Sequence, residues 1–86
     1  MTTTSVERAI TEYVAREVIR DGGAGRLDVD FPLMTEKVLD SMDVQRLVAF
    51  LETHFAIAIT DDWLLPDNFA SVRAIARMVT AIQGQS

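Results

Sequence analysis

The chain contains no cysteine, and this absence excludes two kinds of chemistry. Disulfide bonds cannot stabilise the fold, and no side-chain thiol is available as a nucleophile. Histidine is also scarce, because His54 is the only one. One histidine without cysteine supplies too few ligands for a zinc site, so no metal is expected.

Basic residues are few as well. Eight lysines and arginines stand against thirteen acidic residues, which gives a formal net charge of −5 and an isoelectric point near 4.6. Nucleic-acid binding requires a basic surface, so nucleic acid is not an expected partner. The charge favours cationic protein partners through electrostatic steering. The same charge would also simply keep a small domain in solution.

Long hydrophobic runs are absent, and no stretch reaches the apolar length that spans a membrane. Residues 1–5 lack the basic start and apolar run of a signal peptide, so we expect a cytoplasmic protein without membrane contact. Apolar residues make up 49% and charged residues 24% of the chain, which is a globular composition. A chain of 86 residues buries one core. We therefore expect a single domain over 1–86, with an ordered core over about 5–82.

The first helical pattern covers about 5–20. Thr4 and Glu7 have the spacing of a capping box at its start, and Gly22 and Gly23 follow its end. The apolar stripe of this helix consists of Val6, Ile10, Tyr13, Val14 and Val18. A long connection over 22–40 follows, in which Pro32 excludes a continuous helix. We expect its apolar residues, which are Leu27, Val29, Phe31, Leu33, Val38 and Leu39, to dock on the core.

Two further helices are predicted, over about 41–54 and 70–82. The buried face of the first contains Val44, Leu47, Val48, Leu51 and Phe55, with Phe50 near its edge, and the opposite face contains Met42, Gln45, Arg46, Ala49 and Thr53. The stripe of the last helix is Val72, Ile75, Ala76, Val79 and Ile82, with Phe69 packing at its start.

The segment between these helices is less regular. Residues 56–59 fit a strand or a loop, Thr60 is expected to cap one short turn through Leu64, and Pro66 interrupts the chain again. The predicted fold is all-α. It is a small four-helix bundle of three main helices and one short helix, with a long first loop.

Ser41 stands where the long loop ends and the strongest helical pattern begins. A hydrolytic serine needs a histidine base beside it, and His54 lies further along the same helix on a different side. The chain also has no Gly-x-Ser-x-Gly motif. The sequence therefore does not indicate an enzyme.

The segment Val38-Leu39-Asp40-Ser41-Met42 resembles the attachment motif of the acyl and peptidyl carrier protein family. The similarity extends over about 5–82 and includes the helix start at Phe69-Ala70-Ser71-Val72. The resemblance implies that Ser41 bears a 4′-phosphopantetheine arm, whose terminal thiol holds a thioester. Such a serine should be exposed at a helix start, where the backbone N–H groups favour a phosphodiester. Asp40 would cap that helix or help to orient magnesium-bound coenzyme A.

The resemblance also implies partners. These are a phosphopantetheinyl transferase, a ligase that loads an acyl or aminoacyl group, and downstream enzymes that use it, each acting on a monomeric carrier. We expect these enzymes to contact the helix face that carries Met42, Gln45, Arg46 and Ala49. The motif at Ser41 is especially similar to D-alanyl carriers, and the segment from Asn68 to Ala76 is similar to freestanding carriers of amino acids or unusual extender units.

Two departures from the family pattern bear on the pathway. Lys37 or Val38 stands where many carriers have glycine, and Arg46 stands where an acid is common. This pattern favours a dedicated carrier in secondary metabolism, such as polyketide or nonribosomal peptide synthesis. A housekeeping fatty-acid or D-alanyl carrier is the first alternative. The second is an unmodified helical interaction module, in which the pair Asp40 and Ser41 only caps a helix.

Overall fold

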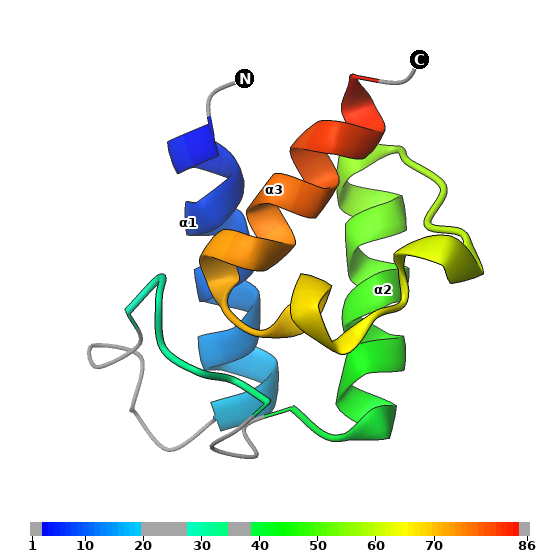
Figure 1. Cartoon of the computed structure of the whole chain (residues 1–86). Helices are drawn as coiled ribbons and strands as arrows, with labels where there is room; N and C mark the ends of the chain where they lie inside the picture. The colour runs from blue at the N-terminus through cyan, green and yellow to red at the C-terminus, as the bar shows by residue number, and fades with distance from the viewer. Residues whose placement is uncertain (1–2, 20–27, 35–38, 85–86) are drawn as a thin grey trace.

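The computed structural model describes residues 3–19, 28–34 and 39–84. Its three α-helices are α1 (Thr3–Tyr13), α2 (Ser41–Phe55) and α3 (Val72–Gln83), and the described residues form no strand. α1 and α2 run in opposite directions, and α3 crosses between them and packs against α1 (Figure 1). The all-α bundle with three main helices is therefore confirmed.

The first helix begins earlier and ends differently than expected. It starts at Thr3, so Thr4 lies inside the helix and the prediction that Thr4 caps it is wrong. After Tyr13 the chain continues as a π-helical segment, η1 (Val14–Ile19), in which the backbone turn widens. Val6, Ile10, Tyr13 and Val14 are buried as predicted. The side chain of Val18 lies outside the described residues.

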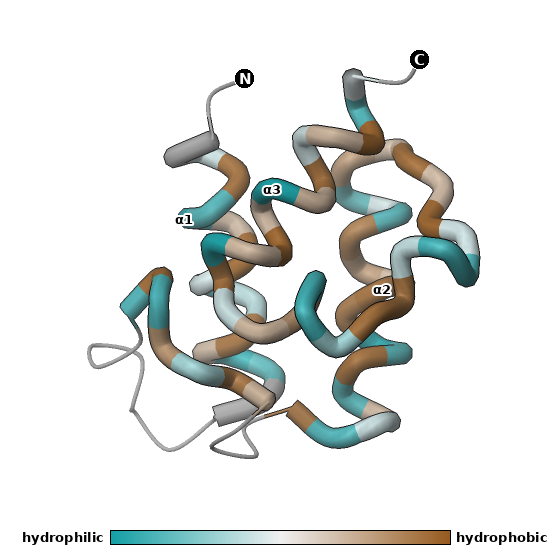
Figure 2. The backbone as a smooth tube through the Cα atoms, in the orientation of Figure 1, coloured by the Kyte–Doolittle hydropathy of each residue, from teal (hydrophilic) through white to brown (hydrophobic). Residues whose placement is uncertain are grey.

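The core receives residues from all three helices, and hydrophobic and hydrophilic residues alternate along each of them (Figure 2). The buried residues of α2 are Leu47, Leu51 and Phe55, and those of α3 are Val72, Ile75, Ala76, Met78, Val79 and Ile82. Val44, Val48 and Phe50 are partly buried against them. The predicted stripes of both helices are therefore confirmed, and Met78 adds to the second.

The short fourth helix is divided into two 3₁₀ turns, η3 (Asp61–Trp63) and η4 (Pro66–Phe69). The Thr60 side chain makes no capping hydrogen bond, so that part of the prediction is wrong. Pro66 does not simply break the chain, because it begins η4, where its fixed φ and missing N–H suit a first helical position. Phe69 anchors η4 in the core with 2% of its surface exposed.

The residue where α2 ends and the residue where α3 begins are both set by neighbouring residues. α2 ends at Ala56, which adopts the left-handed conformation with φ 54°, and residues 57–60 then form a loop and not a strand. The Glu52 carboxylate holds this loop by accepting a 2.8 Å hydrogen bond from the Ile59 amide. α3 starts at Val72, slightly later than predicted, because the Ser71 hydroxyl accepts a 3.1 Å hydrogen bond from the Ala74 amide and caps it.

The described part of the first loop docks on the core as expected. Leu33 and Leu39 are buried, and Val29 and Phe31 are partly buried. The predictions for Leu27 and Val38 lie outside the described residues. Backbone hydrogen bonds fix this loop, because the Leu33 amide donates to the Ala70 carbonyl at 2.8 Å and the Arg73 amide donates to the Val29 carbonyl at 2.8 Å.

Candidate functional site

Asp40 caps α2 through a reciprocal pair of hydrogen bonds. Its Oδ1 accepts from the Asp43 amide at 2.8 Å, and the Asp43 Oδ2 accepts from the Asp40 amide at 3.3 Å. This is a capping box, with aspartate in the position that glutamate usually takes. The hydrogen bond from the Asp43 amide lowers the pKa of the Asp40 carboxyl. Asp40 thus carries a fixed negative charge at the helix N-terminus, where the helix dipole favours it.

Ser41 is the first residue of α2, and its side chain is exposed. No hydrogen bond joins its hydroxyl to another part of the described chain. The hydroxyl is therefore free to be approached by a second molecule. The first-turn N–H groups of α2 lie next to it, and such groups bind phosphate oxygens well.

The outer face of α2 continues from this serine. Met42, Gln45, Arg46 and Ala49 are all exposed, as predicted, and Met42 keeps 62% of its surface accessible. The acids of α2 are engaged elsewhere, since Asp43 belongs to the capping box and Glu52 holds the Ile59 amide. Arg46 is therefore the exposed charge among the four residues of this face.

An apolar hollow of about 540 Å³ opens beside Ser41. Its lining residues come from the first loop, the start of α2, and the segment with η3 and η4: Met34, Leu39, Asp40, Ser41, Val44, Gln45, Leu64, Leu65, Pro66 and Phe69. Leu64 and Leu65 remain 41% and 54% exposed, so apolar surface is available to a ligand. The sequence analysis did not predict this hollow, because its lining comes from segments that are distant in the chain.

His54 lies far from Ser41. The two residues occupy opposite ends of α2, separated by about 20 Å at the helical rise per residue. The imidazole instead stacks on Phe50 with a centroid distance of 5.0 Å, and Phe50 stacks on Tyr13 at 4.3 Å. The structure therefore does not place His54 where it could act as a base for Ser41. Within residues 3–19, 28–34 and 39–84, no group of acidic or histidine side chains is placed to hold a metal ion.

Comparisons with known proteins give no assignment, because neither a family model nor a curated protein matches the chain. None of the helices in the described segments combines the length and apolar character needed to cross a membrane. The features of the site therefore come from the molecule alone: an exposed serine, a capped helix start and an apolar hollow at one place.

Proposed function

We propose that the protein is a freestanding acyl or aminoacyl carrier that bears 4′-phosphopantetheine on Ser41. The observation that carries the proposal is the free, exposed hydroxyl at the first position of α2. A separate transferase has to reach this hydroxyl, and a buried or hydrogen-bonded serine would resist it. The resemblance of the segment Val38-Leu39-Asp40-Ser41-Met42 to carrier motifs supports the same residue.

The residues around Ser41 fit the group that it would bear. The dipole at the N-terminus of α2 favours the negative charge of the phosphodiester, while the Asp43 amide stays with the Asp40 carboxylate. Attachment would form a bond from the Ser41 oxygen to the phosphorus of phosphopantetheine and break the diphosphate bond of coenzyme A. Adenosine 3′,5′-bisphosphate would leave, and the hydroxyl proton would pass to the transferase. The arm would supply the thiol that this cysteine-free chain lacks.

The residues that line the hollow favour one class of group carried on the arm. Its described lining is largely apolar, and Asp40, the one ionised side chain among those described lining residues, is engaged in the capping box. An acyl group with an apolar chain would cover Leu64 and Leu65, whereas a charged aminoacyl group would gain little there. This composition favours an acyl cargo over an aminoacyl cargo.

The exposed residues on the outer face of α2 limit which enzymes can dock there. We propose that the transferase, the loading ligase and the downstream enzymes dock around Met42, Gln45, Arg46 and Ala49. A partner has to pair the exposed Arg46 with an acid or leave it in water, because burying it alone is costly. Enzymes adapted to acidic carriers would fit poorly. We therefore place the protein in a dedicated pathway of secondary metabolism, acting as a cytoplasmic monomer, with a fatty-acid or D-alanyl carrier as the alternative.

One observation favours a second candidate function. The capping box explains the presence of Asp40 without any prosthetic group. An unmodified helical interaction module would keep Asp40 for this reason and would use the apolar residues around Ser41 only for protein contact.

Intact mass separates the two functions. The apo protein is incubated with coenzyme A, magnesium and a transferase of broad specificity. The carrier gains the mass of one phosphopantetheine, and Ser41→Ala does not. Ser71→Ala is the matched control, because Ser71 also stands at a helix start but uses its hydroxyl to cap α3. An unmodified wild type, with a positive control carrier loaded in the same reaction, would favour the interaction module.

A further inference from the structure

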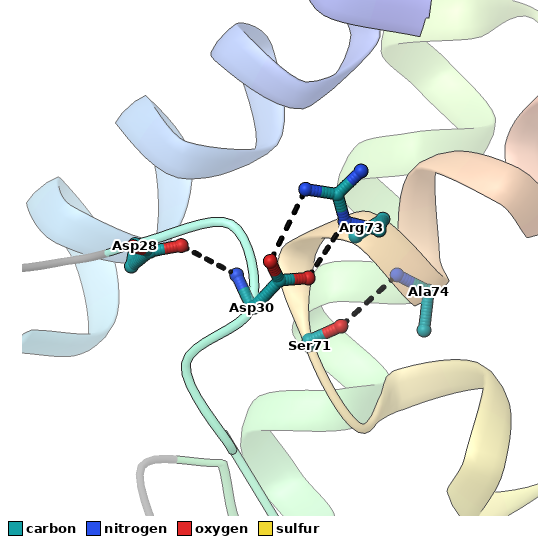
Figure 3. Close-up of polar contacts among 5 residues, drawn as sticks. All are labelled: Asp28, Asp30, Ser71, Arg73 and Ala74. Carbon is teal, nitrogen blue, oxygen red and sulfur yellow. Dashed lines mark hydrogen bonds and ion pairs between the residues drawn. The ribbon is translucent and has the colours of Figure 1, made fainter.

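A cluster of hydrogen bonds and one ion pair holds the first loop against the start of α3 (Figure 3). Arg73 donates from Nε to Asp30 Oδ1 at 2.6 Å and from Nη2 to Asp30 Oδ2 at 3.1 Å. This is a two-point guanidinium–carboxylate contact, which fixes orientation as well as distance. Asp28 shapes the turn, because its Oδ1 accepts a 2.8 Å hydrogen bond from the Asp30 amide. The contact joins residues 43 positions apart in the chain.

Two backbone hydrogen bonds accompany this pair. The Arg73 amide donates to the Val29 carbonyl, and the Leu33 amide donates to the Ala70 carbonyl, each at 2.8 Å. We call the four residues Val29, Asp30, Leu33 and Arg73 the strap. Leu33 is fully buried, so the strap has a fixed point in the core. The ion pair itself is open to solvent, with side-chain exposures of 44% for Arg73 and 64% for Asp30.

The strap connects the two walls of the hollow beside Ser41. One wall contains Met34, which directly follows Leu33, and Leu39, whose amide donates to the Leu33 carbonyl at 3.2 Å. The other wall ends at Phe69, directly before Ala70, the residue that accepts the Leu33 hydrogen bond. The strap therefore joins the backbone segments that directly adjoin the two walls.

We infer that Asp30 and Arg73 are positioning residues that hold the walls of the hollow at the spacing its ligand requires. They touch neither Ser41 nor the ligand, and they act through Leu33 and Ala70. The significance of the hollow rests on the proposed carrier function, whereas the strap itself does not. Because the ion pair is exposed, its effect is local and modest, and added salt weakens it.

The test uses the full chain in four variants. Asp30→Asn and Arg73→Gln each remove the two-point contact. The double variant Asp30→Arg with Arg73→Asp exchanges the charges and restores an ion pair. Arg77→Gln is the matched control, since Arg77 is an exposed arginine one turn further along α3 that acts on Asp30 through its charge and not through a hydrogen bond, and its loss changes the net charge as Arg73→Gln does.

The first measurement is hydrogen exchange of individual amides in the apo proteins. Exchange at Leu33, Leu39 and Arg73 is expected to accelerate by about two- to fivefold in the single variants, as for the loss of an exposed ion pair. Leu47 and Leu51 in α2 should keep their rates, the double variant should return toward wild type, and Arg77→Gln should stay closer to wild type than Arg73→Gln does. Unchanged rates at Leu33 and Arg73 would overturn the strap. Equal acceleration in α2 would show general destabilisation and would overturn the positioning role.

The second measurement is the reactivity of a decanoyl thioester on the holo proteins toward hydroxylamine. A hollow with displaced walls shelters the thioester less, so its cleavage should accelerate in both single variants and recover in the double variant. If the single variants exchange the amides of Leu33 and Arg73 faster but cleave the thioester at the wild-type rate, the strap does not control the hollow and the inference is overturned. If the wild-type protein accepts no phosphopantetheine, the carrier function is refuted. The hydrogen-exchange measurement would still show whether Asp30 and Arg73 hold the first loop to α3.

Discussion

Truncation of Leu51 to alanine is expected to remove a large share of the stability of this domain. Leu51 is fully buried in the middle of α2, among core residues from all three helices. Substitutions of this kind cost about 2–5 kcal/mol, through lost transfer energy and the remaining cavity. At 0.05–0.15 kcal/mol per residue, the whole chain of 86 residues has a free energy of unfolding of about 4–13 kcal/mol.

Urea denaturation measures this loss. With a slope of about 1–3 kcal/mol per molar urea, the midpoint of Leu51→Ala should fall by about 0.7 M or more. Far-UV circular dichroism reports the helices, and the fluorescence of Trp63, the only tryptophan, reports η3. Coincident transitions by the two probes establish two-state unfolding, which the comparison of free energies requires.

Met42→Ala is the matched control, because it truncates an apolar side chain of α2 that is 62% exposed. Its midpoint should stay close to that of the wild type, since exposed substitutions change stability by about 0.5 kcal/mol or less. Leu47→Ala, at the other fully buried leucine of α2, should repeat the loss. Equal midpoints for Leu51→Ala and Met42→Ala would mean that the helical register of α2 is wrong.

Three further predictions follow from charged residues. Asp40→Ala should lower the urea midpoint by less than Leu51→Ala does, and Asp40→Asn should retain most of the cap, because the amide oxygen still accepts from the Asp43 amide. Arg46→Glu should raise kcat/KM with a fatty-acid synthase enzyme adapted to acidic carriers and lower it with a cognate enzyme; equal values in all four combinations would refute a role for this face in specificity. The hydrogen bond from Arg73 lowers the pKa of Asp30, and the positive charge of Arg77 also lowers it. The negative charges of Glu7 and Asp28 raise the pKa of Arg73. This lowered pKa stabilises the folded protein fully at a pH above about 3.9, the pKa of Asp30 in the unfolded chain. The stabilisation is lost as pH falls through the folded pKa. The free energy of unfolding of Arg73→Gln should therefore fall less steeply with decreasing pH than that of the wild type.

The sequence predicted the helices well because their apolar residues recur with helical periodicity. The stripes through Leu47 and Leu51 in α2 and through Ile75 and Val79 in α3 are buried as that periodicity indicated. The segment around Pro66 was harder. A 3₁₀ turn is too short to produce a periodic pattern, and its existence depends on the burial of Phe69.

The positions and exposure of the candidate residues followed from the sequence, but their surroundings did not. Ser41 at the start of α2 and the exposed Arg46 followed from local pattern. The hollow did not, because it forms between segments distant in the chain, and neither Met34 nor Leu65 indicates by itself what it faces. The contact of Asp30 with Arg73 was missed for the same reason. The π-helical turn after Tyr13 was also missed, because apolar spacing does not distinguish it from an ordinary helical turn.

Peptide mapping after loading tests the central claim most directly. Trypsin cleaves after Lys37 and Arg46 and releases residues 38–46, in which Ser41 is the only residue with a hydroxyl group. After incubation with coenzyme A and transferase, this peptide should gain the mass of one phosphopantetheine, and every other peptide should keep its mass. A loaded control carrier beside an unchanged 38–46 peptide, or the arm on any other peptide, would contradict the assignment of Ser41.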